Sequence, residues 1–283
     1  MKKVFRATVV AIMVGILPAV AMAQQVPQVS PTVATPAIPT FPSQVTDTDT
    51  NKPVTVRFVV GWNYAGNSFG SSIEPTPAFG ASYEGATQIP GVTQNVISVW
   101  KWDKYRSKWQ FWAPYISPEY LSGYARANGW CPLSQIHPGD AYWLHASKEF
   151  SVVQPQYYDP AFVLSNLANG SLVGGWNSIA LPNRVTAREL VNLASRNPPA
   201  PGKIGDGTVV SIWTWSAGTW SFYSPRLDEQ GGLVRVAEYA NGHGMRPLDA
   251  VEVGQGAWLN SSQQQNYGDL GECDGDNDQG GKG

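Results

Sequence analysis

Residues 66–70 read G-N-S-F-G, which fits the G-x-S-x-G pattern around a nucleophilic serine. In hydrolases with this pattern the serine stands on a sharp turn between a strand and a helix of a large α/β sheet. Residues 71–77 contain two prolines and predict no helix after Ser68. We therefore expect Ser68 to be a loop serine without a catalytic role.

Histidines and carboxylates offer no other catalytic pattern. His137, His145 and His243 have neither the spacing of a metal-binding pair nor that of a catalytic triad. A carboxylate pair suited to glycoside hydrolysis is not identifiable in the sequence. We predict that the protein is not an enzyme and that its histidines lie on the surface or in loops.

The acidic C-terminal segment carries one weak metal signal. Asp274, Asp276 and Asp278 alternate as the first ligands of a calcium loop do. The sixth position holds Gln279 where such loops need glycine, and the terminal glutamate is missing. A solvated acidic tail explains this stretch better, so we predict no cofactor beyond weak calcium binding there.

Two stretches predict tight β-hairpins with tryptophans on one face. Residues two apart in a strand share a face. In the downstream hairpin, residues 211–225, the shared face holds Trp213 and Trp215 on one strand and Trp220 and Phe222 on the other. Residues 216–219 between them form a short turn with glycine where a positive φ is needed. Upstream, residues 98–114 repeat the pattern around a longer, charged turn.

The repetition extends well beyond the hairpins. Five tryptophans of the first copy have a tryptophan at the matching place in the second: Trp62 with Trp176, Trp100 with Trp213, Trp102 with Trp215, Trp109 with Trp220, and Trp143 with Trp258. Internal repeats on this scale indicate a repeated structural unit. We predict two tandem homologous modules, residues 56–148 and 171–262, joined by a linker over 149–170.

Short helices are expected between the strands of each module. Thr186 and Glu189 form a capping box at the start of one helix, whose counterpart around residues 82–88 is weaker. A second helix is predicted over 117–129, with a counterpart over 233–241. The predicted fold class is β-rich α+β. Each module is a small, mainly antiparallel sheet with a Trp-rich hairpin and one or two short helices.

Aromatic side chains are the leading candidates for a binding surface, because rings stack on sugars and anchor protein interfaces. Lys101 suggests that the hairpin face opposite the tryptophans is wet and that the repeated tryptophans face the core. The predicted ligand-binding residues are Trp112 and Tyr223 on that opposite face, Tyr105 in the first hairpin loop, and Trp130, which has no tryptophan counterpart. The alternative is that these rings cover a helix or the neighbouring module.

The repeated pattern resembles tandem tryptophan-rich repeats of exported bacterial proteins. In those proteins a G-W-N strand, a W-x-W…W-x-F/Y-x-P hairpin and a P-G-x-x-x-W closing strand recur. The resemblance covers both copies, about two thirds of the chain. It implies the architecture and export, and it implies no defined activity.

Residues 1–23 have the three parts of a secretory signal peptide. A basic start is followed by an apolar run over 7–20 and an A-x-A site at 21–23. The apolar run is shorter than the roughly 20 residues of a membrane span. We expect export with cleavage before Gln24, to the periplasm, the cell surface or the exterior, without stable membrane insertion afterwards.

Two further segments predict disorder rather than a core. Residues 24–55 are rich in proline and threonine and predict an extended linker, while residues 263–283 predict an acidic, glycine-rich tail. In an oxidising compartment Cys131 and Cys273 can pair and staple this tail to the first module. Two unpaired thiols are the alternative.

Charge and composition limit the partners. Without residues 1–23 the chain keeps 16 of its 19 lysines and arginines against 21 aspartates and glutamates, a net charge of −5. Nucleic acid is therefore not an expected partner, because binding it needs a basic surface. We predict an exported, non-catalytic binding protein for polysaccharide or an envelope or surface protein. The alternatives are a structural spacer or assembly subunit of the cell envelope or extracellular matrix, and a secreted hydrolase.

Overall fold

A computed structural model describes residues 54–87, 94–154, 172–263 and residue 273. The expected signal peptide, nearly all of the expected linker over 24–55 and most of the acidic tail lie outside the described residues. Within the described ranges, no helix combines the length and the hydropathy that crossing a membrane requires.

The first half of the chain forms a five-stranded sheet in the order β2-β6-β3-β4-β5. Its neighbouring strands are antiparallel except for the parallel pair β4 and β5. The strands are β2 (Gly61–Gly66), β3 (Val96–Asp103), β4 (Lys108–Trp112), β5 (Cys131–Pro132) and β6 (Ala141–Ala146).

The second half forms a sheet of the same strand order, β8-β14-β10-β11-β12, in which only β11 and β12 are parallel. Its strands are β8 (Gly175–Ala180), β10 (Val209–Ser216), β11 (Thr219–Tyr223), β12 (Arg246–Pro247) and β14 (Gly256–Ser261). The β-rich character and the mainly antiparallel sheets expected from the sequence are confirmed.

Two short antiparallel ribbons complete the sheet structure. One pairs β1 (Val54–Phe58) with β7 (Phe150–Gln154), and the other pairs β9 (Val185–Thr186) with β13 (Ala250–Val251). β7 lies within the linker expected over 149–170, and only Val54 and Thr55 of β1 belong to the linker expected over 24–55. Strands replace the expected linker at these two edges, where the stacked rings of Phe58 and Phe150, 4.9 Å apart, hold β1 and β7 together.

Both hairpins have the expected register. Trp213 faces Phe222 and Trp215 faces Trp220 across β10 and β11, as their counterparts do across β3 and β4. The turn between β10 and β11 contains Ala217 at φ 49° and Gly218 at φ 76°. Two consecutive positive φ values are what a two-residue hairpin turn of type I′ requires.

The helices follow the expectations in part. The structure has α4 (Pro118–Ala127) as expected, and α6 (Ala187–Leu193) has the complete capping box. The helix expected over 82–88 is absent from the described residues there. Instead α3 (Pro75–Phe79) begins at the first proline of the stretch in which we expected no helix, because proline suits a first helical turn. The last helix, α7 (Pro225–Gly242), is interrupted by non-helical backbone at Gly231 and Gly232, so its second segment begins at residue 233 as expected.

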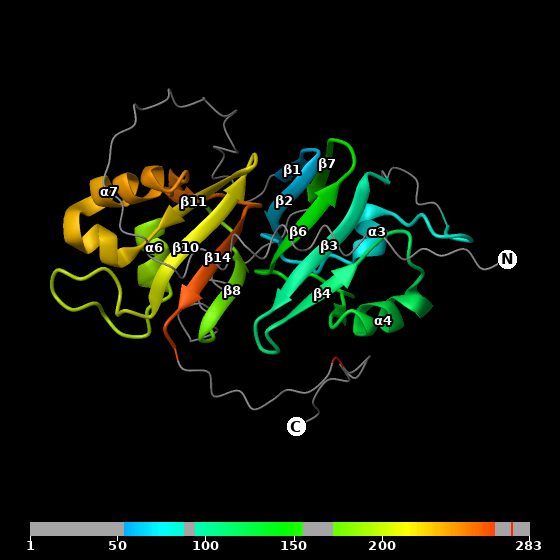
Figure 1. The fold of residues 1–283 in the computed structure, drawn as a ribbon, viewed down its shortest axis with the longest axis horizontal. Coiled ribbons are helices and arrows are strands. Elements are labelled where there is room, and N and C mark those ends of the chain that lie inside the picture. Colours follow the sequence, from blue (N-terminus) through cyan, green and yellow to red (C-terminus); the bar gives the residue numbers. More distant parts are fainter. Residues whose placement is uncertain (1–53, 88–93, 155–171, 264–272, 274–283) are drawn as a thin grey trace. The chain divides into compact units, whose positions relative to one another are not determined.

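The sheet faces opposite the tryptophans carry hydrophobic cores, so the expectation that these faces are wet is wrong, while the tryptophans are buried or half-buried as well. In the second half, Leu190 and Val191 of α6 pack with Ile212, Tyr223 and Leu259 of the sheet. In the first half, Phe79 of α3 contacts Trp112 and Tyr142. Figure 1 shows α3 and α4 beside β3 and β4, and α6 and α7 beside β10 and β11.

The G-W-N sequence that opens each sheet is a backbone clamp. The Asn177 amide accepts from the Val173 amide nitrogen and donates to the Val173 and Gly175 carbonyls. Asn63 makes the same three bonds to Val59 and Gly61. The asparagine thereby fixes the turn before the strand, in which the glycine has a positive φ of 84° or 93°.

The tryptophan faces meet between the two halves, and four of the tryptophan contacts there form matching pairs. Trp143 lies 6.0 Å from Trp215 and 5.8 Å from Trp220. At the matching positions of the other half, Trp258 lies 6.1 Å from Trp102 and 5.8 Å from Trp109. The tryptophans are thus half-buried or buried in contacts between the halves.

Polar bonds follow the same reciprocal pattern. Trp102 Nε1 donates to the Trp176 carbonyl, and Trp215 Nε1 donates to the Trp62 carbonyl. Tyr64 and Ser178 occupy matching positions and bond to each other at 2.7 Å. Because the Ser178 hydroxyl also donates to the Ala141 carbonyl, Tyr64 is the donor to Ser178.

Two backbone hydrogen bonds bring the halves closest together. Gly66 N donates to the Gly254 carbonyl at 2.9 Å, and Ala180 N donates to the Gly139 carbonyl at 2.7 Å. A Cβ on Gly66 would lie 2.5 Å from the Cβ of Ala180. The approach therefore requires a glycine opposite the alanine.

A disulfide joins Cys131 of β5 to Cys273, 142 residues away in the sequence. Arg126 of α4 donates to the Cys273 carbonyl at 2.9 Å, so the backbone of this residue is held as well as its sulfur. Crosslinks that close loops typically stabilise a fold by roughly 2–5 kcal/mol, mainly by restricting the unfolded chain.

The substitution Asn177→Ala should lower the free energy of unfolding by about 1–3 kcal/mol, because it leaves the buried Val173 amide without an acceptor. The matching substitution Asn63→Ala should cost less, since its bonds to Val59 are solvent-exposed. Urea unfolding of the two variants measures the difference. Equal losses would show that burial does not set the strength of the clamp.

The substitution Gly66→Ala should lower the free energy of unfolding by about 1–3 kcal/mol, because its Cβ collides with Ala180. Adding Ala180→Gly should restore part of the loss, as the alanine and the glycine then exchange places. Gly123→Ala on α4 is the control, because its Cβ meets nothing within 4 Å and alanine favours the helix. Denaturation of the three variants gives the comparison, and an unchanged Gly66→Ala protein contradicts the close approach.

Candidate functional site

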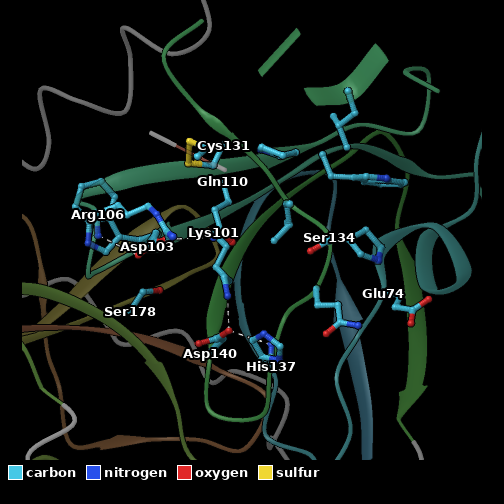
Figure 2. Close-up of a pocket in the computed structure, with 18 of the residues that line it drawn as sticks. Glu74, Lys101, Asp103, Arg106, Gln110, Cys131, Ser134, His137, Asp140 and Ser178 are labelled. Carbon is cyan, nitrogen blue, oxygen red and sulfur yellow. Dashed lines mark hydrogen bonds and ion pairs between the residues drawn. A yellow bond between two sulfur atoms is a disulfide. The ribbon is translucent and has the colours of Figure 1, made fainter. Parts of the chain in front are cut away.

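An open cleft of about 1210 Å³ lies beside the first sheet, on the side that carries Lys101 and Trp112. Its wall includes α3, the β3–β4 hairpin, α4, the segment 131–140, and residues 178–180 of the second half. Figure 2 shows charged and amide side chains, among them Lys101, Asp103, Gln110 and Asp140, converging on this space. We call it the polar cleft.

The Lys101–Asp140 ion pair lies at the floor of the polar cleft. Lys101 Nζ lies 2.6 Å from Asp140 Oδ2, which also accepts from the His137 amide at 2.9 Å. Asp140 is placed by a turn over 137–140, in which Gly139 has φ 86°, the value a type II turn needs at its third residue. Lys101 is placed by the alternation of β3.

A second ion pair organises the hairpin loop at the rim. The Asp103 carboxylate accepts from the Tyr105 and Arg106 amides at 3.0 and 3.1 Å and from Arg106 Nη1 at 2.9 Å. These bonds form an Asx turn, in which the side-chain carboxylate accepts hydrogen bonds as a backbone carbonyl does in an ordinary turn. The longer, charged turn of the first hairpin thus has a defined conformation and presents Tyr105.

Aromatic and cationic groups share this rim. Tyr105 is 43% exposed, and Lys104 Nζ lies 5.1 Å from its ring centre. Burial is the main cause that lowers the pKa of the Lys104 ammonium, and Lys101 acts in the same direction. Trp102, half-buried, also lines the cleft.

The second half and the disulfide both contribute to the wall. Ser178 lines the polar cleft and is held by its bonds to Tyr64 and the Ala141 carbonyl. Cys131 and Cys273 also line it. The shape of the cleft therefore depends on contacts between residues far apart in the sequence.

The prediction that Trp112 and Tyr223 form an exposed aromatic platform is wrong. Trp112 is 4% exposed and Tyr223 is fully buried. The Trp112 indole donates to Thr76 Oγ1 of α3, and the Tyr223 hydroxyl donates to Asp228 of α7 at 2.7 Å. Strand alternation predicts the correct face for both residues, but helices cover that face, in agreement with the alternative interpretation.

Asp228 connects two helices around Tyr223. The buried Asp228 carboxylate accepts both guanidinium bonds of Arg188, each at 2.6 Å. The Arg188 guanidinium holds the pKa of Asp228 below its usual range, while burial and then the Asp228 carboxylate raise the pKa of Tyr223. This arrangement links α6 to α7 and is structural.

Of the four predicted ligand-binding residues, Trp112 and Tyr105 line the polar cleft, while Tyr223 and Trp130 do not. Tyr105 is exposed at the rim of the polar cleft. Trp130 is half-buried and packs against Trp100 at 4.6 Å and Phe111 at 5.4 Å, so it extends the tryptophan face instead of lining the cleft. The structure does not bring the four predicted residues together.

Ser68 and two histidines have structural contacts. Ser68 is buried, and its hydroxyl accepts from the Gly254 amide at 2.8 Å. His145 stacks on Trp62 at 4.6 Å, and burial lowers its pKa. His243 stacks on Tyr239 at 4.2 Å.

His137 lines the cleft and bonds to Ser72 at 3.0 Å. The calcium prediction for Asp274, Asp276 and Asp278 falls outside the described residues. Among the residues that are described, no group of three or more histidine, cysteine, aspartate or glutamate side chains could hold a metal ion.

Sequence reasoning missed the polar cleft, although one signal pointed to it. Lys101 matches Thr214 in the second half, and Asp140 matches Gln255. The ion pair therefore has no counterpart there, while the tryptophan contacts around it are repeated. The cleft is therefore indicated by positions at which the two copies differ, whereas the repeat itself is defined by positions at which they agree.

Comparison with known proteins finds no family model, curated protein or solved structure that matches the chain.

The substitution Tyr223→Phe should lower the free energy of unfolding by about 1.5–3 kcal/mol, because a buried hydrogen bond to a charged group is lost. Tyr120→Phe is the control, since Tyr120 is 71% exposed on α4 and should change stability by no more than about 0.5 kcal/mol. Thermal and urea unfolding measure both. Equal stability of the two variants would contradict the structural role of Tyr223.

Proposed function

We propose that the protein is an exported, non-catalytic binding protein of two tandem modules, and that it binds polysaccharide in the polar cleft of the first module. The observation that carries the proposal is the open cleft of about 1210 Å³ in which an exposed tyrosine rim borders paired charged groups. Sites for sugars and other polar ligands are concave and combine aromatic surface with a few placed polar groups.

The two-module interpretation is supported by the equal strand order of the two sheets and by the reciprocal tryptophan contacts. Export rests on residues 1–23, whose basic, apolar and A-x-A parts are those of a signal peptide. Neither argument depends on the ligand.

The carboxylates of the cleft favour binding over hydrolysis. Glycoside hydrolysis needs one carboxyl group as proton donor and a second as base or nucleophile. Asp103 and Asp140, two of the three carboxylates in the described lining, are held by cationic side chains at 2.9 and 2.6 Å, so both already have partners within the protein.

A structural or assembly role is the second candidate. It is favoured by the contacts between the halves, in which the two modules serve each other as packing surfaces. A folded protein that binds no glycan would leave this role as the better explanation.

The substitution Tyr105→Ala should weaken glycan binding by roughly 3- to 10-fold, which corresponds to about 0.5–1.5 kcal/mol of lost aromatic contact. Tyr120→Ala is the matched control, because it removes an exposed tyrosine that does not line the cleft. Tryptophan fluorescence of the mature protein, titrated with soluble polysaccharides, measures binding, since Trp102 and Trp112 line the cleft. A folded protein that shows no saturable change with any glycan contradicts the proposed function.

A further inference from the structure

The described lining of the polar cleft has balanced charge. It contains three cationic side chains, Lys101, Lys104 and Arg106, and three carboxylates, Glu74, Asp103 and Asp140. An acidic polysaccharide would require an excess of cations in the cleft, and a cationic one an excess of carboxylates, because association is favoured by complementary charge. The balance matches a ligand without net charge.

The floor of the cleft offers a hydrogen-bond donor and an acceptor side by side. An ammonium group has three N–H donors, and Lys101 uses one of them on Asp140. Asp140 Oδ2 accepts from Lys101 and His137, while Oδ1 accepts no hydrogen bond from the described residues. The pair therefore keeps donors on one member and an acceptor on the other.

The exposure of this pair suits contact with a ligand. The Lys101 side chain is 11% exposed and that of Asp140 is 31% exposed, so the carboxylate is reached from the cleft while the ammonium is largely shielded. Figure 2 shows both side chains on the cleft wall near His137. Reduced contact with water strengthens the hydrogen bonds that a ligand makes there.

We infer, on the basis of the proposed function, that the ligand of the polar cleft is an uncharged polyhydroxylated glycan whose neighbouring hydroxyl groups bond to Lys101 and Asp140 together. A hydroxyl group both donates and accepts. Two adjacent hydroxyls thus satisfy the ammonium and the carboxylate without separating them. A ligand carboxylate or sulfate near Lys101 would be repelled by the Asp140 carboxylate. A ligand amine near Asp140 would be repelled by the Lys101 ammonium.

Comparison of the two halves favours recognition over packing as the role of this pair. The tryptophans that join the halves occur in both copies, and so do the clamping asparagines. Thr214 and Gln255 stand at the matching places in the second half, and that sheet forms its core without an ion pair there. The fold therefore does not require Lys101 and Asp140.

A charge change at the pair tests the inference. Asp140→Asn keeps the shape and leaves Lys101 without its counter-charge, so the ratio of affinities for polygalacturonate over a neutral glycan should rise by about tenfold or more. Lys101→Met leaves Asp140 unpaired, so the ratio of affinities for a chitosan hexamer over a neutral glycan should also rise by about tenfold or more. Calorimetric titration with cellohexaose, maltohexaose, mannan, polygalacturonate and chitosan hexamer measures these ratios.

Glu238→Gln is the matched control, because it removes one carboxylate from an exposed ion pair on α7, away from the cleft. It should leave the preference of the mature protein for neutral glycans unchanged. Tighter binding of polygalacturonate or chitosan than of neutral glycans by the unaltered protein would overturn the inference and leave the proposed function standing. Unchanged ratios in both folded cleft variants would also overturn it, while no binding of any glycan would overturn the proposed function itself.

Discussion

Two backbone hydrogen bonds, from Gly66 to Gly254 and from Ala180 to Gly139, hold the halves of the chain in direct contact. Backbones this close leave no room for a second side chain, so small residues must stand at the centre and large rings must lie to the sides. The tryptophans meet this requirement, because each hairpin extends its rings over the other half and donates an indole N–H to a carbonyl there. The same contact between the halves therefore determines where the two backbones run and which side chains are buried beside them.

The polar cleft is a consequence of that contact. Residues 178–180 of β8 form part of its wall because β8 is bonded to the turn that carries Asp140. The second half is therefore part of the wall of the polar cleft without supplying a charged group to its described lining. A change in the contact between the halves would displace both Asp140 and Ser178, so the shape of the polar cleft depends on this contact.

Local features of the fold could be predicted from the sequence, and features set by distant partners could not. The hairpin registers and the capping box of α6 depend on residues a few positions apart. Lys101 in a strand indicates a solvent-exposed face unless its partner is known, and that partner, Asp140, is 39 residues away in the sequence. Strand alternation likewise showed that Trp112 and Tyr223 share one kind of face, but α3 and α7 cover those faces through contacts with Thr76 and Asp228.

The disulfide gives the chain a closed covalent path. From Cys131 the backbone runs through the whole second sheet to Cys273 and returns to its start through the sulfur bridge. A single cut in the backbone anywhere along this ring opens it without dividing the molecule. After one cleavage within this ring the two halves therefore stay covalently joined, and the covalent connection is lost only after reduction of the disulfide or a second cut.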